Sequence, residues 1–309
     1  VVLYFSHNLG GGTGLYSKNY LSKIDKKNYL LVNNYKIFFW DVAYKISYKS
    51  HSFILRHKML SAYLNKVNIK SIYVNSLVSY SKVFNVIDSI CKLYEKTKCP
   101  ITIAFHDYFP ICKHYNLFCN HKNCSTYCDT KEVVKWQVYW KKLFDVASEL
   151  RVFSERSKYI LSKFVPDYLN KVTVVPHSTD YLKNQRPILY KKQPLTIGIM
   201  GDICSEIKGH FILKKLLEKY KIHLFGKTFL INKNLINHGS YTIENIRQKL
   251  IDNGINLILF KSVWEETFSY VTSEIIALGL PVICFDIGAQ SEKVKNYDRG
   301  IVVKNLDEM

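Results

Sequence analysis

Two glutamates, Glu266 and Glu274, lie eight residues apart across the expected start of a helix, in the sequence ETFSYVTSE. The sequence GLPVICF follows and predicts a helix stop at Gly279 and then a buried strand. Acidic residues are common near helix starts because they complement the positive end of the helix dipole. The order of strand, acidic loop, helix and strand, however, favours an α/β domain with a ligand site at the carboxyl ends of its strands.

The chemistry that suits these carboxylates is recognition of sugars. An ionised carboxylate offers only hydrogen-bond acceptors, and vicinal hydroxyls are donors. Glu274 is placed to accept the hydroxyl hydrogens of a ribose, and Glu266 to accept sugar hydroxyls or to offset positive charge on the sugar. The backbone N–H groups of Ser269, Tyr270 and Val271 at the helix start are candidates to bind a diphosphate.

Lys208 is a further candidate phosphate ligand. With Gly209 it follows the expected strand at 195–200 and precedes an expected helix. A lysine there can reach phosphate oxygens as a point charge, while the helix N-terminus adds its dipole. A Lys-Gly pair is unspecific in a chain with 44 Lys and Arg, so its position carries the prediction.

The first half of the chain offers a glycine-rich loop and a histidine. The sequence GGGTG at 10–14 separates an expected strand from an expected helix, and its backbone N–H groups, those of Gly11 and Gly12 among them, can approach an anion closely. The spacing is not G-x-G-x-x-G, so a tight turn without a ligand is the alternative. His106 ends the expected strand at 101–105, where an open sheet presents ligand groups; a hydrogen-bonded structural histidine is the alternative.

Two α/β units are needed to position these residues. Strands are expected at 1–5, 29–33, 71–75, 101–105, 150–153 and 172–175. Between them, one helix is expected to begin at 15, and two others to cover 83–98 and 133–147. Later strands are expected at 195–200, 222–225 and 256–260, with helices ending at 219 and covering 243–253. Alternation predicts parallel sheets. We therefore expect a Rossmann-like domain at 1–178, a linker at 179–194 and a second Rossmann-like domain at 195–309, facing a central cleft.

Composition restricts the classes of partner. The 309 residues include 44 Lys and Arg against 25 Asp and Glu, a net charge of +19. Such a charge favours phosphorylated ligands, nucleic acid or an anionic membrane, although scattered lysines also arise from genome base composition. Aromatic residues fall in apolar runs, which argues for a core and against stacking on nucleic acid.

No run approaches the roughly 18 to 20 apolar residues that cross a bilayer, and no cleavable leader opens the chain, so a cytoplasmic protein is expected. The chain begins inside an expected strand without an initiator methionine, which favours a piece of a longer polypeptide.

Four cysteines crowd between Cys112 and Cys128, with His114 and His121 among them. A structural zinc loop is conceivable, but the usual C-x2-C pairs are missing. Ordinary reduced thiols are the alternative, and we predict no metal.

Together these motifs resemble the GT-B glycosyltransferases, specifically the retaining enzymes of glycosyltransferase family 4. The most specific match is the E-x7-E sequence at 266–274 followed by ALGLPV at 277–282. Weaker matches are GGGTG at 10–14, HDY at 106–108, VVPH at 174–177, KG at 208–209 and GA at 288–289 with Glu292.

The resemblance implies a role for each candidate residue. Glu274 would hold the nucleotide ribose and Glu266 would contact the donor sugar. Lys208 would bind the diphosphate, and His106 would lie beside the anomeric carbon. The loop with Gly11 and Gly12 would lie under the donor phosphates or line the acceptor side. No cofactor or metal ion is implied.

Three departures from the family pattern stand out. Asp202 occupies a position where a basic residue often follows Gly201, and Ser269 replaces a usual glycine. The sequence given also ends at Met309, short of the family's last helices.

We therefore expect a hexosyltransferase that acts in polysaccharide or glycolipid synthesis. Its partners would be a nucleotide-sugar donor and a glycan or lipid-linked acceptor, with peripheral contact to an anionic inner membrane face as a further option and no nucleic acid. An inactive nucleotide-sugar-binding or scaffold module of a larger protein is the alternative. The loops at 108–129 and 239–241 would select the sugar, the base and the acceptor, none of which the motifs identify.

Overall fold

A computed structural model describes residues 1–7, 9–25, 28–32, 37–39, 42–44, 68–119, 122–124, 131–189 and 193–309. The chain divides into two compact units, and each is described by itself. The first comprises Val1–Leu117, Cys124–Phe153 and Lys158–His177, and the second Phe118–Asn123, Ser154–Ser157 and Ser178–Met309.

The first unit contains a sheet with the strand order β10-β9-β6-β5-β1-β2-β3-β4. The pairs among the first six of these strands are parallel, and β3 and β4 add antiparallel pairs. The strands are β1 (Val2–Phe5), β2 (Tyr29–Val32), β3 (Ile37–Phe39), β4 (Val42–Tyr44), β5 (Ser71–Val74), β6 (Ile101–Ala104), β9 (Glu149–Val152) and β10 (Val172–Val174).

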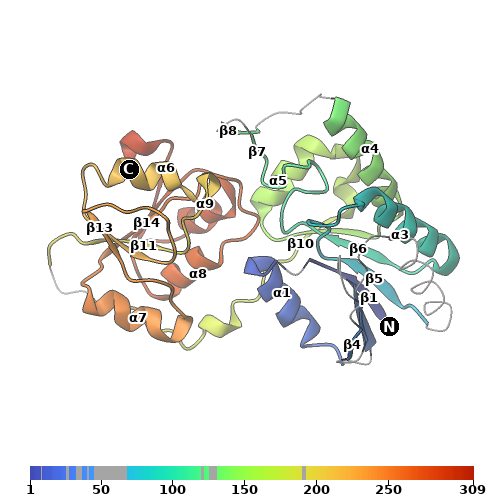
Figure 1. Ribbon diagram of the computed structural model, residues 1–309, viewed down its shortest axis with the longest axis horizontal. Coiled ribbons are helices and arrows are strands. Elements are labelled where there is room, and N and C mark those ends of the chain that lie inside the picture. The colour runs from blue at the N-terminus through green and yellow to red at the C-terminus, as the bar shows by residue number, and fades with distance from the viewer. Residues whose placement is uncertain are drawn as a thin grey trace. The chain divides into compact units, whose positions relative to one another are not determined.

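Helices of this unit are α1 (Gly11–Leu21), α3 (Val83–Thr97), α4 (Lys131–Val146) and α5 (Glu155–Phe164), with the 3₁₀ turn η2 (Pro166–Lys171). The first three residues of α5, Glu155–Ser157, belong to the second unit. Helix α3 buries Val83, Val86, Ile87 and Ile90, the spacing of one helix face. Helices α3 and α4 pack side by side (Figure 1).

The second unit contains a parallel sheet with the order β13-β12-β11-β14-β15-β16. The strands are β11 (Ile197–Met200), β12 (Ile222–Phe225), β13 (Leu235–Asn237), β14 (Leu257–Phe260), β15 (Val282–Phe285) and β16 (Gly300–Val303). The helices are α6 (His210–Leu216), α7 (Ile243–Asp252), α8 (Tyr270–Ala277) and α9 (Gly288–Lys295), with the 3₁₀ turns η3 (Asp180–Leu182), η4 (Glu206–Lys208) and η5 (Leu306–Glu308). The hairpin β7 (Phe118–Cys119) and β8 (Lys122–Asn123) also belongs to this unit.

Both faces of the second sheet are covered. Side chains of α7 and α8 pack with Met200, Ile258 and Phe260 on one face. Side chains of α6 pack with alternate strand residues, Ile199 and Leu259 among them, on the other. Figure 1 shows β11 and β14 between α6 above and α7 and α8 below. Burial of parallel strands on both faces explains why they appear in the sequence as continuous apolar runs.

These observations confirm the predicted fold class of two Rossmann-like α/β domains. The expected and observed helix boundaries differ most at the first helix, which begins at Gly11 rather than at 15. The segment expected as a linker contributes to the second unit, because Ile188 is buried in its core and η3 lies within it. In the part of the chain that the structure describes, no helix is long and apolar enough to cross a membrane.

Candidate functional site

The strand order of the second unit defines where a ligand is expected. From β11 the chain adds β12 and β13 on one side, and then crosses to β14, β15 and β16 on the other. The reversal lies between β11 and β14, and open α/β sheets bind ligands outside the carboxyl ends of the strands at such a point. Gly201 follows β11 there, and Lys261 follows β14.

Lys208 and Glu266 form an ion pair at this place. The Lys208 Nζ atom lies 2.9 Å from Glu266 Oε1, and the Ser262 hydroxyl donates to the same oxygen at 2.8 Å. Glu266 is only 5% exposed. Burial works to raise the pKa of Glu266, but the Lys208 ammonium and the Ser262 hydroxyl outweigh it and hold that pKa below its ordinary value. The structure thus brings together two of the predicted site residues, with the carboxylate ionised.

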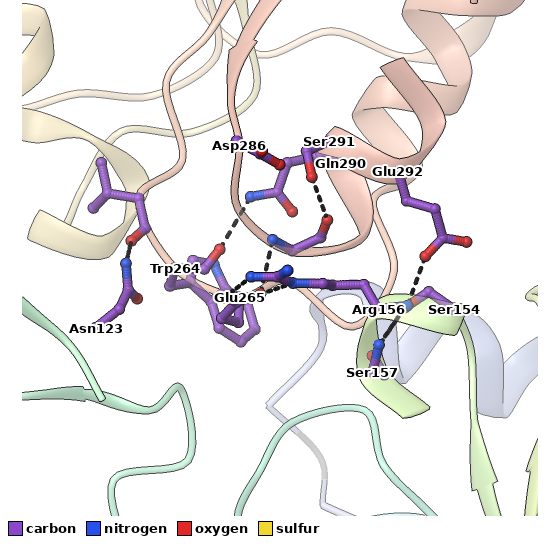
Figure 2. Close-up of polar contacts among 12 residues, drawn as sticks. Asn123, Ser154, Arg156, Ser157, Trp264, Glu265, Asp286, Gln290, Ser291 and Glu292 are labelled. Atoms are coloured by element: carbon purple, nitrogen blue, oxygen red, sulfur yellow. Dashed lines mark hydrogen bonds and ion pairs between the residues drawn. The ribbon is translucent and has the colours of Figure 1, made fainter. Parts of the chain in front are cut away.

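Hydrogen bonds to the backbone hold the loop between β14 and α8, and Figure 2 shows those made by Asn123 and Gln290. Asn123 donates to the carbonyl of Val263 at 2.7 Å, and Gln290 donates to the carbonyl of Trp264 at 3.0 Å. Ala289 N–H donates to the Glu266 carbonyl at 2.7 Å. These bonds fix the backbone just before Glu266 and at its own carbonyl, so the position of Glu266 is set before any ligand arrives.

Glu265 anchors the same loop through the segment Ser154–Ser157. The Arg156 guanidinium donates to both Glu265 oxygens, at 2.6 and 2.9 Å, and Gly288 N–H donates at 2.8 Å (Figure 2). Glu292 accepts from the Arg156 N–H at 2.7 Å. A paired, planar contact of this kind fixes orientation as well as position.

Gly288 is required for this arrangement. It has φ +65°, and a Cβ atom there would lie 2.5 Å from the Glu266 nitrogen and 2.3 Å from Gln290 Oε1. Both the backbone conformation and the space therefore exclude a side chain.

Helix α8 begins where the sequence predicts. Ser269 is its N-cap, and the serine Oγ accepts from the Thr272 N–H at 3.3 Å. The first turn lies beside Gly201, because a Cβ on Gly201 would meet Val271 Cγ2 at 3.3 Å. The first turn of α8, which contains Tyr270 and Val271, therefore lies next to the carboxyl end of β11. The positive end of the α8 dipole is at this turn.

A second lysine, Lys293, reinforces the start of α8. Its Nζ atom donates to the Ser269 carbonyl at 2.9 Å and to Ser273 Oγ at 2.6 Å, and it lies 3.3 Å from the centroid of the Phe268 ring. Burial lowers the pKa of Lys293 to about 7.

Glu274 lies on α8 between two tyrosines. Tyr181 OH donates to Oε1 at 3.1 Å, and Tyr241 OH donates to Oε2 at 2.6 Å. Burial raises the pKa of Glu274, and the two hydroxyls act in the opposite direction. A carboxylate accepts about four hydrogen bonds, so about two acceptor positions remain for the hydroxyls of a ribose.

In the first unit, His106 is buried in a polar and aromatic cluster. Its Nε2 atom lies 2.7 Å from Asn75 Oδ1, and Asn75 Nδ2 donates to Ser6 Oγ and Ser17 Oγ at 3.0 Å each. The His106 ring stacks on Phe153 at 4.5 Å between centroids. Ser6 follows β1 and Asn75 follows β5, the two strands at which the order of the first sheet reverses.

The His106 imidazole is expected to stay neutral well below pH 6.5. Burial, with smaller effects from His177 and His7, lowers its pKa well below the ordinary value. The unfolded chain then binds a proton that the folded chain does not, so the stability is present above pH 6.5 and is lost as the pH falls below it. Relative to His106→Gln, the wild type should lose up to about 1.4 kcal/mol of unfolding free energy per pH unit.

Urea unfolding of both proteins between pH 7.5 and 5 measures that difference. Parallel pH profiles of the two proteins would contradict the neutral state, as would an imidazole NMR signal of His106 that titrates near pH 6.5.

Gly11 and Gly12 occupy the exposed first turn of α1. Gly11 has φ +66°, a backbone conformation that favours glycine with or without a ligand, and a Cβ atom there would meet nothing within 4 Å. The open space leaves room for the anion that this loop is predicted to bind through its backbone N–H groups. Gly11, Gly12 and His106 belong to the first unit, and the other predicted site residues belong to the second.

The cysteine-rich segment is only partly described, because His121 and Cys128 lie outside the described residues. Within the described ranges, no group of three or more His, Cys, Asp or Glu side chains is arranged to hold a metal ion.

Sequence reasoning missed several residues of this site. The pairings of Tyr181 and Tyr241 with Glu274, and of Arg156 with Glu265, join positions 33 to 109 residues apart and leave no local pattern. Lys261 carried a usable signal, since a lysine directly after the apolar strand LILF lies at a carboxyl end.

Comparison with known proteins agrees with the fold. Residues 194–309 match the family model of the glycosyl transferases group 1. No curated protein sequence matches the chain.

Three solved structures of two proteins similar in fold cover nearly the whole chain. Alr3699/HepE of Anabaena in complex with UDP has 13% identity and a TM-score of 0.60, over 98% of this chain and 85% of that one. The same protein with UDP-glucose has 12% identity and a TM-score of 0.61, over 98% and 85%. The apo form of the lipopolysaccharide outer core galactosyltransferase WaaB has 15% identity and a TM-score of 0.61, over 100% and 88%.

At such identities the structures show the fold alone, which is the GT-B fold of two Rossmann-like domains. The family match, at 194–309, covers the part of the second unit that holds Lys208, Glu266 and Glu274. Fold and family match together support a GT-B glycosyltransferase.

Proposed function

We propose that this protein transfers a sugar from a nucleoside diphosphate sugar to an acceptor hydroxyl, with retention at the anomeric carbon. The ion pair between Lys208 and Glu266, at the strand reversal of a unit that matches a glycosyltransferase family model, carries the proposal. It supplies a cation for a diphosphate and, next to it, a carboxylate for a sugar.

The proposed reaction depends on electrostatics. As the bond between the anomeric carbon and the diphosphate breaks, negative charge grows on the leaving group, where Lys208 and the α8 dipole stabilise it. Positive charge develops on the sugar ring, and the ionised Glu266 offsets it. Because burial lowers the pKa of His106 well below its ordinary value, the imidazole is a weak base, and the proposed acceptor of the hydroxyl proton is the leaving phosphate itself.

His106 is the second residue that we propose as catalytic. A neutral, buried imidazole adds no charge that would repel the developing cation, and its bond to Asn75 fixes the ring. This assignment rests on the sequence resemblance together with that burial.

We further propose that the enzyme transfers a hexose from its donor without a metal ion, because Lys208 and the α8 dipole neutralise the charge of the diphosphate. Addition of EDTA should then leave turnover unchanged. A glycan or lipid-linked acceptor in cell-surface polysaccharide or glycolipid synthesis fits the net charge of +19, which would hold a cytoplasmic enzyme against an anionic membrane face.

A donor screen tests the proposed function. Thermal shift and hydrolysis should be measured with UDP-, GDP- and dTDP-hexoses, and we expect one base to raise the unfolding temperature and its hexose to be released or transferred. ¹H NMR of the first product should show the anomeric configuration of the donor. An inverted product would refute retention, and a failure of all three nucleotides to bind would refute the function itself.

The alternative is an inactive module that binds nucleotide sugars. It is favoured by Asp202, whose carboxylate follows Gly201 and accepts from the Lys227 N–H at 2.8 Å, so that residue supplies no cation to the phosphates. Donor binding without hydrolysis or transfer to any acceptor would support this reading.

A further inference from the structure

Lys261 lies at the strand reversal of the second unit but has no place in the function described above. It is the first residue after β14, and β14 is the neighbour of β11. A Cβ on Gly201, which follows β11, would lie 3.9 Å from the Lys261 Nζ atom. The ammonium is therefore located behind Gly201 and the first turn of α8, where the sheet is expected to bind a ligand.

The Lys261 side chain is buried without a carboxylate partner. It is only 2% exposed, and its Nζ atom donates a long bond of 3.4 Å to the carbonyl of Met200. Among the described residues, no carboxylate oxygen lies within 4.0 Å of it. Glu266, the acidic side chain of the cluster, is already paired with Lys208. Burial, and then repulsion by Lys208, lower the pKa of Lys261 to about 7.

The neighbouring loop is shaped around Lys261. A Cβ atom on Gly209 would lie 2.3 Å from the Lys261 carbonyl oxygen and 2.6 Å from Lys261 Cγ. Gly209, with φ +82°, therefore lets the loop that carries Lys208 pack directly on the Lys261 stem. Both lysines are brought to one place by this contact.

We propose that Lys261 is a second lysine that binds the diphosphate of the donor, acting beside Lys208. The inference rests on the proposed function. A buried ammonium without a counter-ion is costly in a protein, whereas a diphosphate seated against Gly201 and α8 supplies the missing negative charge. The flexible stem of lysine allows Nζ to turn from the Met200 carbonyl toward a phosphate oxygen.

A purely structural role makes the opposite prediction about stability. A buried lysine that served the fold would lower stability on removal. An ammonium retained for a ligand is a burden in the free protein, and an apolar chain of similar length should be tolerated or preferred there. Stability and affinity should therefore change in opposite directions.

Calorimetric titration of the full chain tests this role of Lys261. The ligands are UDP, GDP and dTDP, followed by the nucleoside that corresponds to the nucleotide that binds. Lys261→Met should weaken binding of the diphosphate about 10-fold or more, leave nucleoside affinity unchanged, and keep or raise the unfolding temperature of the free protein. Lys215→Met, which removes an exposed lysine of α6, is the matched control and should change neither affinity.

The outcomes separate this inference from the proposed function. If the wild type binds no nucleoside diphosphate, both are overturned. If it binds and Lys261→Met binds equally well, or loses diphosphate and nucleoside in parallel, only the role of Lys261 is overturned.

Proton uptake gives a readout that does not depend on a folded variant. Because a bound diphosphate raises the pKa of the ammonium, wild-type binding at pH 8 should take up protons and should weaken from pH 7 to 9. Other titratable groups facing Lys261 are Lys208, Glu266, Asp202 and Cys204. Calorimetric titration in buffers of different ionisation enthalpy measures the proton uptake. Lys293 also has a lowered pKa, so Lys293→Met is the control, and the uptake should persist in this variant. Absence of uptake by the wild type would overturn the proposal.

Discussion

Replacing Glu274 by alanine is expected to weaken binding of the nucleoside diphosphate donor by about 100-fold, because two charge-assisted hydrogen bonds to the ribose are lost. The carboxylate is held in place by Tyr181 and Tyr241, each of which uses one of its oxygens. Rotational freedom of the side chain is therefore already restricted in the free protein, and little ordering cost remains to be met on binding. Isothermal titration with the preferred nucleotide measures the loss.

In Glu274→Ala the hydroxyls of Tyr181 and Tyr241 lose their acceptor, which can also disturb the fold. Controls must therefore separate the loss of ligand contacts from a loss of folded structure. Glu274→Gln keeps the size of the side chain and removes its charge, and it should lose an intermediate part of the affinity. Tyr241→Phe removes a donor to Glu274 but keeps the acceptor, so it should retain most of the affinity. Thermal melts of each variant report the fold. Unchanged donor affinity in a folded Glu274→Ala protein would contradict the role of this residue.

Much of the second unit is predictable because its strands are short, parallel and buried on both faces. Leu257–Phe260 and Val282–Phe285 are continuous apolar runs, and each is bounded by residues that end it. The helix between them begins at a serine cap, a local signal that fixed its start to one residue. Burial and capping are local properties, so one sequence is enough to show them.

Edge elements were missed for the converse reason. Strand β13 has three residues, Leu235–Asn237, none of them buried, so no apolar run marks it. Strands β3 and β4 likewise have three residues each, and they pair antiparallel at the edge of the first sheet. Such short edge strands are defined by their pairing with a neighbouring strand, and pairing is not visible in local composition.

The candidate site divides in the same way. Its acids and Lys208 were predictable because carboxyl ends of strands and helix starts are local features. Their supports were not, since Arg156 reaches Glu265 across 109 residues and Asn123 reaches Val263 across 140. Lys261 was overlooked for another reason: its position directly after the strand at 257–260 is visible in the sequence, but the burial that sets it apart from the other basic residues is not.

The largest effect on turnover is expected for Glu266→Gln. The substitution keeps the shape of the side chain but removes the negative charge that faces the developing positive charge of the sugar, and we expect kcat to fall by about 100-fold to 1000-fold. Among the described residues, Lys208 and Ser262 both donate to Oε1, so Oε2 remains able to meet the donor sugar. Single-turnover hydrolysis of the preferred donor measures the rate of the chemical step.

Donor affinity should respond differently from turnover. With Glu266 neutral, the charge of Lys208 is no longer balanced, so the affinity for the diphosphate should be kept or increased while kcat falls. Ser262→Ala is the matched control, because it removes one hydrogen bond to the same oxygen and keeps the carboxylate. Equal losses of affinity in Glu266→Gln and Glu274→Ala, with kcat unaffected, would contradict the division of labour, in which Glu274 binds the donor and Glu266 acts on the sugar.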